Sequence, residues 1–209
     1  IVTVAPETAN AMDFIKECGA KVSIGHSDAD YDTAIEAIEN GADCLTHTLN
    51  AMTPLHHRNP GIVAAAADKN IYVQVICDGL HIHPSMIRIL YKLFGSERMI
   101  LISDSMRATK LSDGKYEFGG QDVFVNNGVA KTADGAIAGS TTTLFECVQC
   151  AIKFGIPEDD AYKMASQTPA EYMNIKKGKL EIGYDCDLLI LNPDGTIRAT
   201  IIEGVQFKN

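Results

Sequence analysis

The sequence predicts an α/β fold built on a parallel sheet of the (β/α)8-barrel type, followed by a small antiparallel β region. Apolar strand-like runs alternate with helical patterns along most of the 209 residues, as in successive βαβ units. The runs are almost continuously apolar, as expected for strands that are covered on both faces. Several of them also end on a residue that can bind a metal or move a proton, which is typical of the mouth of such a barrel.

The predicted barrel strands follow one another at the spacing of βα units. They are residues 1–4, 22–25, 44–46, 71–76 and 99–103. The first of these runs, Ile1 to Val4, already reads as a buried strand and is not preceded by an initiator Met. We therefore expect that the beginning of the barrel is missing from this sequence.

Helices are predicted from their apolar stripes and their end signals. Asp30 is a good N-cap for a helix that Gly41 ends, and Pro84 fits the first turn of a helix that Gly95 ends. A third helix carries an apolar stripe from Leu144 and ends near residue 155, and a fourth begins at residue 157.

Two segments depart from this alternation. Residues 115–137 contain Asn-Gly and Asp-Gly pairs between short β-like runs, which predicts a β-hairpin excursion after the last barrel strand. From about residue 178 the runs are typical of antiparallel strands. We therefore divide the chain into a barrel part, 1–177, and a β appendage, 178–209.

Composition narrows the class of protein. The chain is 46% hydrophobic and 22% charged, and no run approaches the roughly 20 apolar residues of a membrane span. No secretory leader pattern is present, so we expect a cytoplasmic protein. The net charge of −9 argues against a nucleic-acid surface but is compatible with an anionic small substrate. The six cysteines are scattered and do not predict a disulfide framework.

The candidate site residues stand at the strand ends. His26 and His47 would project from adjacent strands, and two imidazoles with coordination positions to spare suit zinc or a similar divalent metal. His81 follows the fourth predicted strand. Asp104 follows the fifth, where a carboxylate could take a proton from a metal-bound water. The pattern predicts a metal-assisted hydrolase.

Other polar residues could bind a substrate or a metal, or they could have a purely structural role. Asn50 and Arg58 could hold polar or anionic parts of a substrate, and the N–H groups of residues 138–140 could contact a ligand. The Cys147 and Cys150 pair lies on an apolar helical stripe, which favours core packing over metal binding. We do not expect the loop histidines, 56, 57 and 83, to be ligands, and we disfavour Glu7 as a third ligand.

The strand-end motifs resemble those of the amidohydrolase superfamily. They are Gly25-His26-Ser27, Thr46 to Met52, Asp78 to His81, and Ile102-Ser103-Asp104. The segments 58–61, 138–140 and 178–188 narrow the resemblance to its N-acetylglucosamine-6-phosphate deacetylase family. The resemblance covers essentially the whole chain.

The resemblance implies strands 4–8 of a TIM-like barrel and part of a small β-sandwich. It implies a metal held by His26 and His47, most simply Zn²⁺, with Fe²⁺, Mn²⁺ or Co²⁺ as alternatives. Asp104 would act as general base and then as general acid in releasing acetate from an N-acetylated amino-sugar phosphate. The substrate-binding residues implied are Asn50, Ala51, Arg58, His81, Ala138, Gly139 and Ser140. Arg58 would serve the neighbouring subunit of a homodimer.

The sequence also departs from that family. It lacks the metal-binding Glu that follows an earlier barrel strand in that family, and it lacks the first three strands of the barrel. We therefore expect the isolated chain to be inactive or nearly so. Three alternatives stay open. They are another amidohydrolase acting on a cyclic amide or other N-acyl substrate, a metal-free lyase or isomerase, and a truncated sugar-phosphate binding protein.

Overall fold

The computed structural model describes residues 1–207, and its centre is a parallel sheet of five strands. The spatial order follows the chain order, and every neighbouring pair is parallel, as in one half of a (β/α)8 barrel. The strands are β1 (Val2–Val4), β2 (Val22–Ile24), β3 (Ala42–Leu45), β4 (Tyr72–Ile76) and β5 (Met99–Ile102). The predicted partial barrel is therefore confirmed, with every strand within two residues of its predicted start.

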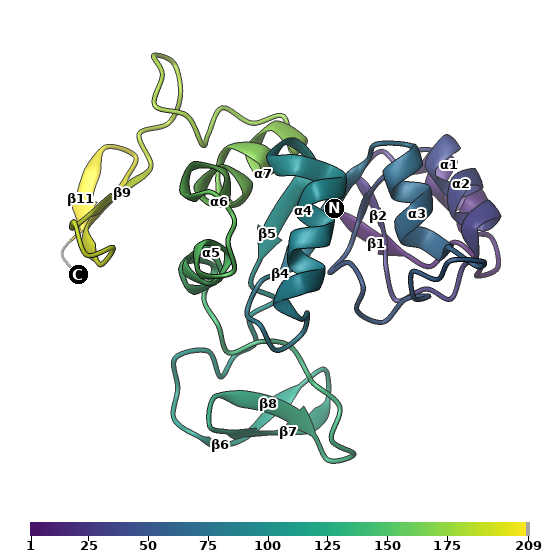
Figure 1. The fold of residues 1–209 in the computed structure, drawn as a ribbon, viewed down its shortest axis with the longest axis horizontal. Coiled ribbons are helices and arrows are strands. Elements are labelled where there is room, and N and C mark those ends of the chain that lie inside the picture. The colour runs from purple at the N-terminus through teal and green to yellow at the C-terminus, as the bar shows by residue number, and fades with distance from the viewer. Residues whose placement is uncertain (208–209) are drawn as a thin grey trace.

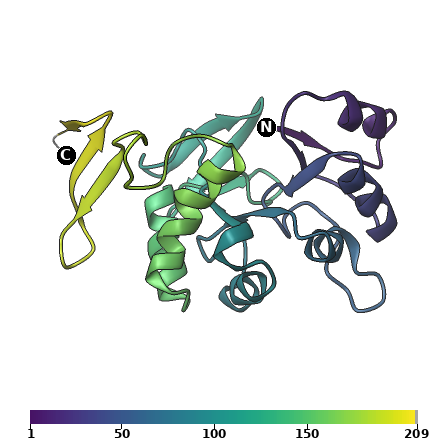
Figure 2. The ribbon, with the colours of Figure 1, turned by 90° about the horizontal axis from the view of Figure 1, so that it is seen from above.

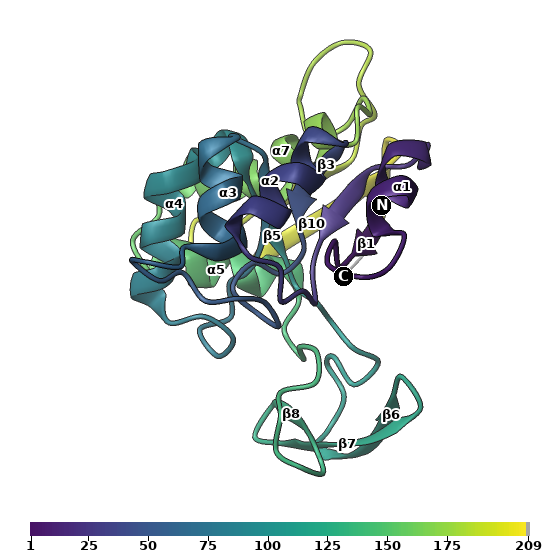
Figure 3. The same ribbon diagram turned by 90° about the vertical axis from the view of Figure 1, so that its right-hand side faces the viewer.

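Seven helices connect or follow the strands in the described part of the chain (Figure 1). They are α1 (Ala11–Glu17), α2 (Tyr31–Glu39), α3 (Gly61–Asp68), α4 (Pro84–Arg98), α5 (Leu144–Lys153), α6 (Glu158–Ala165) and α7 (Gln167–Tyr172). The apolar side chains of α1 to α6 and of the strands share one core, represented by Ile15, Ala34, Ile62, Leu90 and Val148, whereas Tyr172 of α7 packs in a separate cluster with Cys44 and Ile100. The core thus lies between the sheet and the helices that cover its outer face (Figure 3).

The helix ends follow the local signals of the sequence. The Asp30 carboxylate accepts a hydrogen bond from the Thr33 N–H at the start of α2, and Pro84 occupies the first turn of α4. Near the end of α4, Gly95 has non-helical dihedral angles (φ 61°, ψ 179°), so it interrupts the helix, and a short continuation runs to Arg98. The α7 helix has no counterpart among the predicted elements.

The excursion after β5 is a three-stranded antiparallel sheet rather than a single hairpin. Its strands are β6 (Gly114–Phe118), β7 (Gln121–Asn126) and β8 (Val129–Thr132). The expected Asn127-Gly128 turn joins β7 to β8, and the preceding Gly119-Gly120 turn, with φ of 60° and 79°, adds the third strand. This sheet has a small core of its own, centred on Val123 and Val125.

The C-terminal strands form a second antiparallel sheet, β9 (Leu188–Leu191), β10 (Ile197–Ile202) and β11 (Val205–Phe207). Seen from above, this sheet lies at one end of the molecule and α1 at the other (Figure 2). All six cysteines are free thiols, and Cys147 is fully buried in the main core. Among residues 1–207, no helix combines the length and the apolar character needed to cross a membrane.

Candidate active site

His26 and His47 meet at the carboxyl ends of β2 and β3. Because these strands are hydrogen-bonded neighbours in the sheet, the residues that follow them project from adjacent positions. Their Nε2 atoms are 2.9 Å apart and the ring centroids 4.6 Å apart, with the rings nearly perpendicular. The two nitrogens therefore converge closely enough for one ion to contact both.

The surroundings of His47 favour its neutral form. Its side chain is buried, whereas His26 is exposed. Burial lowers the pKa of His47, and the neighbouring His26 lowers it further, against a smaller opposing effect of Asp104. A neutral imidazole is the form that binds a metal. The effect of Asp104 also means that this carboxylate lies within electrostatic reach of His47.

The three residues with predicted chemistry share an unusual backbone. His26, His47 and Asp104 all have positive φ, at 49°, 30° and 50°. This left-handed region is uncommon for residues other than glycine, although His and Asp enter it more often than most. Non-glycine residues in this region tend to cluster at active sites and ligand clamps. At all three strand ends, the backbone therefore turns sharply just where the chemical group is placed.

Glu7 holds the turn that follows His26. One carboxylate oxygen accepts a hydrogen bond from the Ser27 hydroxyl at 2.6 Å, and the other accepts one from the Asp28 N–H at 2.7 Å. The Ser27 N–H in turn donates to the Ala51 carbonyl at 3.0 Å. Glu7 thus braces the His26 turn, and that turn is bonded to the loop that follows His47.

Asp104 is joined to the segment 138–140. The Asp104 carbonyl accepts a hydrogen bond from the Ser140 N–H at 2.8 Å, and the Ser140 carbonyl accepts one from the Met106 N–H at 2.8 Å. Gly139 has φ of 67°, and a Cβ there would lie 3.3 Å from the Asp104 carbonyl oxygen. The segment that the resemblance assigns to the substrate, including buried Ala138, therefore lies directly beside Asp104.

His81 is oriented by a carboxylate that the sequence analysis did not select. The Asp78 Oδ2 atom lies 2.6 Å from the Nδ1 atom of His81, and both side chains are almost fully buried. They belong to the loop between β4 and α4. Since β4 lies between β3 and β5 in the sheet, this loop stands at the same edge as His47 and Asp104.

The remaining candidates lie in the loop after β3. The Asn50 amide donates to the carbonyl of His47 at 3.1 Å and, more weakly, to that of Thr48 at 3.4 Å, so it supports the histidine loop. Ala51 is exposed and has φ of 47°. Arg58 is exposed, and its backbone N–H donates to His56 Nδ1 at 3.3 Å. The structure brings Asn50 and Ala51 next to the histidine pair and places Arg58 farther along the exposed loop.

The histidine pair offers two nitrogen donors to a metal ion but not a complete set of ligands. Within residues 1–207 no group of three His, Cys, Asp or Glu side chains is arranged to hold a metal ion. Within those residues the buried Nδ1 atom of His47 has no hydrogen-bond partner. A metal-bound histidine normally donates a hydrogen bond from its second ring nitrogen. The donors fit two positions of a metal site. Glu7 adds no third, because both its oxygens are engaged by Ser27 and Asp28.

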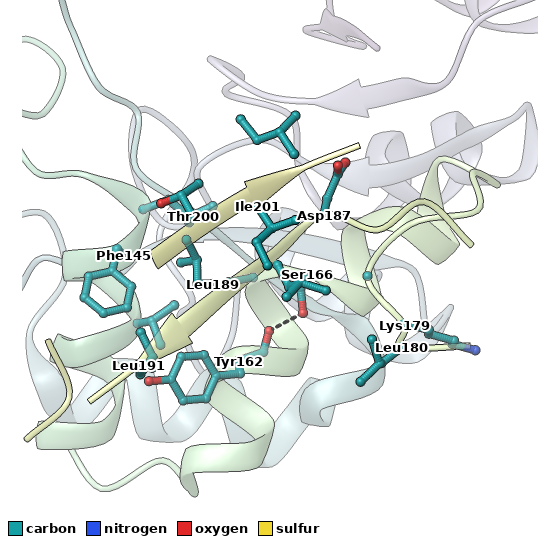
Figure 4. A pocket seen from close by; sticks show the side chains of 16 residues that line it. Phe145, Tyr162, Ser166, Lys179, Leu180, Asp187, Leu189, Leu191, Thr200 and Ile201 are labelled. Atoms are coloured by element: carbon teal, nitrogen blue, oxygen red, sulfur yellow. Dashed lines mark hydrogen bonds between the residues drawn. The ribbon is translucent and has the colours of Figure 1, made fainter. Parts of the chain in front are cut away.

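A groove of about 880 Å³ lies away from these residues (Figure 4). It is lined by α5, α6, the 178–180 segment, and strands β9 and β10, and most of the lining is aliphatic or aromatic, as with Phe145, Leu189 and Ile201. None of the candidate site residues lines it. This groove is therefore separate from the strand-end residues described above.

Sequence reasoning missed the supporting residues Asp78 and Ser27, and it considered Glu7 only as a ligand. The i, i+3 spacing of Asp78 and His81 across a glycine was a usable signal for their pairing. The link from Glu7 to Ser27 joins residues 20 positions apart, in the loops that follow two different strands. No local pattern could have predicted that link.

Comparison with known proteins agrees with this architecture. A model of the amidohydrolase family matches residues 2–206. The N-acetylglucosamine-6-phosphate deacetylase of Vibrio furnissii is 40% identical over 210 residues, which cover 97% of this chain and 52% of that protein. The N-acetylgalactosamine-6-phosphate deacetylase of Escherichia coli O157:H7 is 35% identical over 211 residues, covering 98% and 56%.

A solved structure gives the same result. A mutant N-acetyl-D-glucosamine-6-phosphate deacetylase of Mycobacterium smegmatis, in complex with N-acetyl-D-glucosamine-6-phosphate, is 35% identical with a TM-score of 0.93. The match covers 98% of this chain and 56% of that one. The chain spans about half the length of the curated relatives it matches. With the family model covering nearly all of its residues, the chain belongs to the amidohydrolase family.

Proposed function

We propose that this chain carries the C-terminal part of a metal-dependent deacetylase acting on N-acetylglucosamine 6-phosphate. The observation that carries the proposal is the convergence of His26 and His47 at adjacent strand ends, within electrostatic reach of Asp104. The similarity to deacetylases of N-acetylated hexosamine 6-phosphates supports the substrate class.

His26 and His47 would hold the metal, with Zn²⁺ as the ion best suited to two neutral imidazoles and a further ligand. A divalent ion bound there would supply Lewis acidity, which would lower the pKa of a water and withdraw charge from the acetamide carbonyl. Asp104 takes a proton from the attacking water and delivers it to the nitrogen as the C–N bond breaks. The products are acetate and glucosamine 6-phosphate.

The other strand-end residues would bind the sugar phosphate. His81 follows β4, the sheet neighbour of the strand that precedes Asp104, and the 138–140 segment is hydrogen-bonded to the Asp104 backbone. Asn50 and Ala51 follow His47 in the loop after β3. Arg58, exposed on its loop, would reach the phosphate in a neighbouring subunit of a homodimer. Since the described residues supply only two metal ligands, we expect the isolated chain to be inactive or nearly so.

A chimera tests the proposal directly. Residues 1–207 would replace the matching half of the Vibrio furnissii deacetylase, and acetate release from N-acetylglucosamine 6-phosphate would be measured. We expect activity in the chimera. The Asp104→Asn variant should lose several orders of magnitude in kcat while keeping its metal, as measured by elemental mass spectrometry.

The controls separate function from folding. His26→Ala and His47→Ala should abolish both metal and activity, whereas His83→Ala, which removes a histidine at the start of α4, should keep both. A folded, metal-loaded chimera that releases no acetate would contradict the proposed reaction. Activity of Asp104→Asn within tenfold of the parent would contradict the role of Asp104. Faster acetate release from N-acetylgalactosamine 6-phosphate than from N-acetylglucosamine 6-phosphate would show that the proposed sugar is wrong.

A further inference from the structure

The loop between β4 and α4 contains a carboxylate whose hydrogen-bonding capacity is used almost entirely on one histidine. Asp78 Oδ2 contacts His81 Nδ1 at 2.6 Å. Asp78 Oδ1 accepts hydrogen bonds from the backbone N–H of Leu80 at 2.8 Å and of His81 at 3.0 Å. The Asp78 side chain is 2% exposed and that of His81 8%. The carboxylate therefore fixes both the ring and the backbone of the same residue.

These contacts decide which form of the ring is present. Burial acts to raise the pKa of Asp78, but the hydrogen bonds from His81 and Leu80 outweigh it and bring the pKa below its ordinary value. Asp78 is therefore ionised at neutral pH and can only accept hydrogen bonds. The proton between the two residues belongs to Nδ1. Among residues 1–207 no hydrogen bond to the Nε2 atom of His81 is found, so this nitrogen is available to a ligand.

The loop is shaped to make this pair. Gly79 has φ of 76°, and a Cβ at this position would lie 2.9 Å from the Phe154 ring. The left-handed turn at Gly79 folds the chain back, so that residues three apart face each other. The turn stands between the ends of β3 and β5, which carry His47 and Asp104.

We propose that Asp78 is a positioning residue, which holds His81 in its Nδ1–H form and leaves Nε2 as the atom that meets the ligand. Only the identity of that ligand, a sugar phosphate, rests on the proposed function. The general principle is that the hydrogen bond at one ring nitrogen sets the chemistry at the other. Here it makes Nε2 an acceptor for a hydroxyl when the ring is neutral, or a charged donor to a phosphate when the ring is protonated.

Nitrogen NMR of the 209-residue chain, labelled with ¹⁵N-histidine and held about two pH units above the ordinary histidine pKa of about 6.5, tests the proposal. Such spectra distinguish a protonated ring nitrogen from a bare one. We expect His81 to be Nδ1–H in the parent protein. In Asp78→Ala the Nδ1–H to Nε2–H ratio should fall about tenfold or more, the size expected when a hydrogen bond to a charged group is lost.

The chain contains its own control. His83 Nδ1 accepts a hydrogen bond from the Ser85 N–H at 3.2 Å, so His83 should be Nε2–H in every sample. If Asp78→Ala fails to fold, Asp78→Asn serves, because its amide oxygen can still accept from the loop N–H groups. The amide NH2 group then faces His81 Nδ1 as a donor, so the His81 ratio should fall in the same direction and by a larger factor than in Asp78→Ala. An Nε2–H ring in the parent, or a ratio unchanged in the folded variant, would overturn the proposal.

A ligand titration separates this proposal from the proposed function. N-acetylglucosamine 6-phosphate, with inorganic phosphate in a parallel sample, should shift the His81 Nε2 resonance and leave that of His83 in place. If the variant changes the ratio but neither ligand shifts His81, the positioning role stands and the assigned contact with sugar phosphate is wrong. If the ligand shifts His81 and the variant leaves the ratio unchanged, Asp78 is not a positioning residue.

Discussion

Removing the Glu7 carboxylate should destabilise the chain and loosen the turn that carries His26. In Glu7→Ala, the buried Ser27 hydroxyl loses the acceptor of its proton and the Asp28 N–H loses its partner. Hydrogen bonds to a charged group contribute about 1.5–3 kcal/mol each when buried. Glu7 itself is exposed, so solvent screening reduces this. We expect a loss of about 2 kcal/mol in the free energy of unfolding at pH 7.

Urea unfolding followed by circular dichroism measures this loss. With a slope of about 2 kcal/mol per molar urea, the midpoint should fall by about 1 M. Glu7→Gln, which keeps an acceptor oxygen but no charge, should lose about half as much. Glu17→Ala is the matched control, because Glu17 is exposed on α1 and makes no side-chain hydrogen bond within the described residues. Its midpoint should stay within about 0.2 M of the parent.

The pH dependence gives an independent check. Burial acts to raise the pKa of Glu7, but the hydrogen bonds from Ser27, from its own N–H and from Asp28 bring it below the ordinary value of 4.5. Its contribution is therefore complete above pH 4.5 and is lost as the pH falls through the lower folded value. Other carboxylates titrate nearby, so the difference between parent and Glu7→Ala is the informative quantity. A difference absent at pH 7, or still complete at pH 3, would refute the reasoning.

Two further changes probe the frame of the site. A Cβ on Gly25 would lie 2.6 Å from the Cβ of Thr46, so Gly25→Ala should push the end of β2 away from β3. We expect this variant to lose about 1–3 kcal/mol of stability and to bind metal more weakly. Gly19→Ala is the control and should be tolerated, because a Cβ at Gly19 would meet no atom within 4 Å. Tyr172→Phe removes a hydroxyl that donates to Asp43 at 2.8 Å, so the thermal midpoint should fall by an amount equivalent to about 1 kcal/mol with metal content unchanged.

The sequence was sufficient to predict the order of the strands and the residues at their ends. Apolar runs and strong end signals, such as Asp30 and Pro84, are local properties, and the structure retains them. The supports of the site depend instead on contacts between elements. Glu7 reaches Ser27 only because β1 pairs with β2. Tyr172 contacts Asp43, 129 positions away in the sequence, and it lies on α7, a helix that the sequence did not predict. Periodicity carries no information about such pairs.

The left-handed backbone at His26, His47 and Asp104 could not be predicted either, yet it affects how any variant should be interpreted. A non-glycine residue held at positive φ costs of order 1 kcal/mol, and the cost is smaller for asparagine than for alanine. His26→Ala therefore removes an imidazole and adds backbone strain, whereas His26→Asn removes the imidazole with less strain. Both variants should lose the metal, but the asparagine variant should unfold at a higher urea concentration. If the two variants are equally stable, strain at this strand end is too small to matter. In that case, the turn is held by its hydrogen bonds to Glu7 and Ala51 rather than by the residue type at position 26.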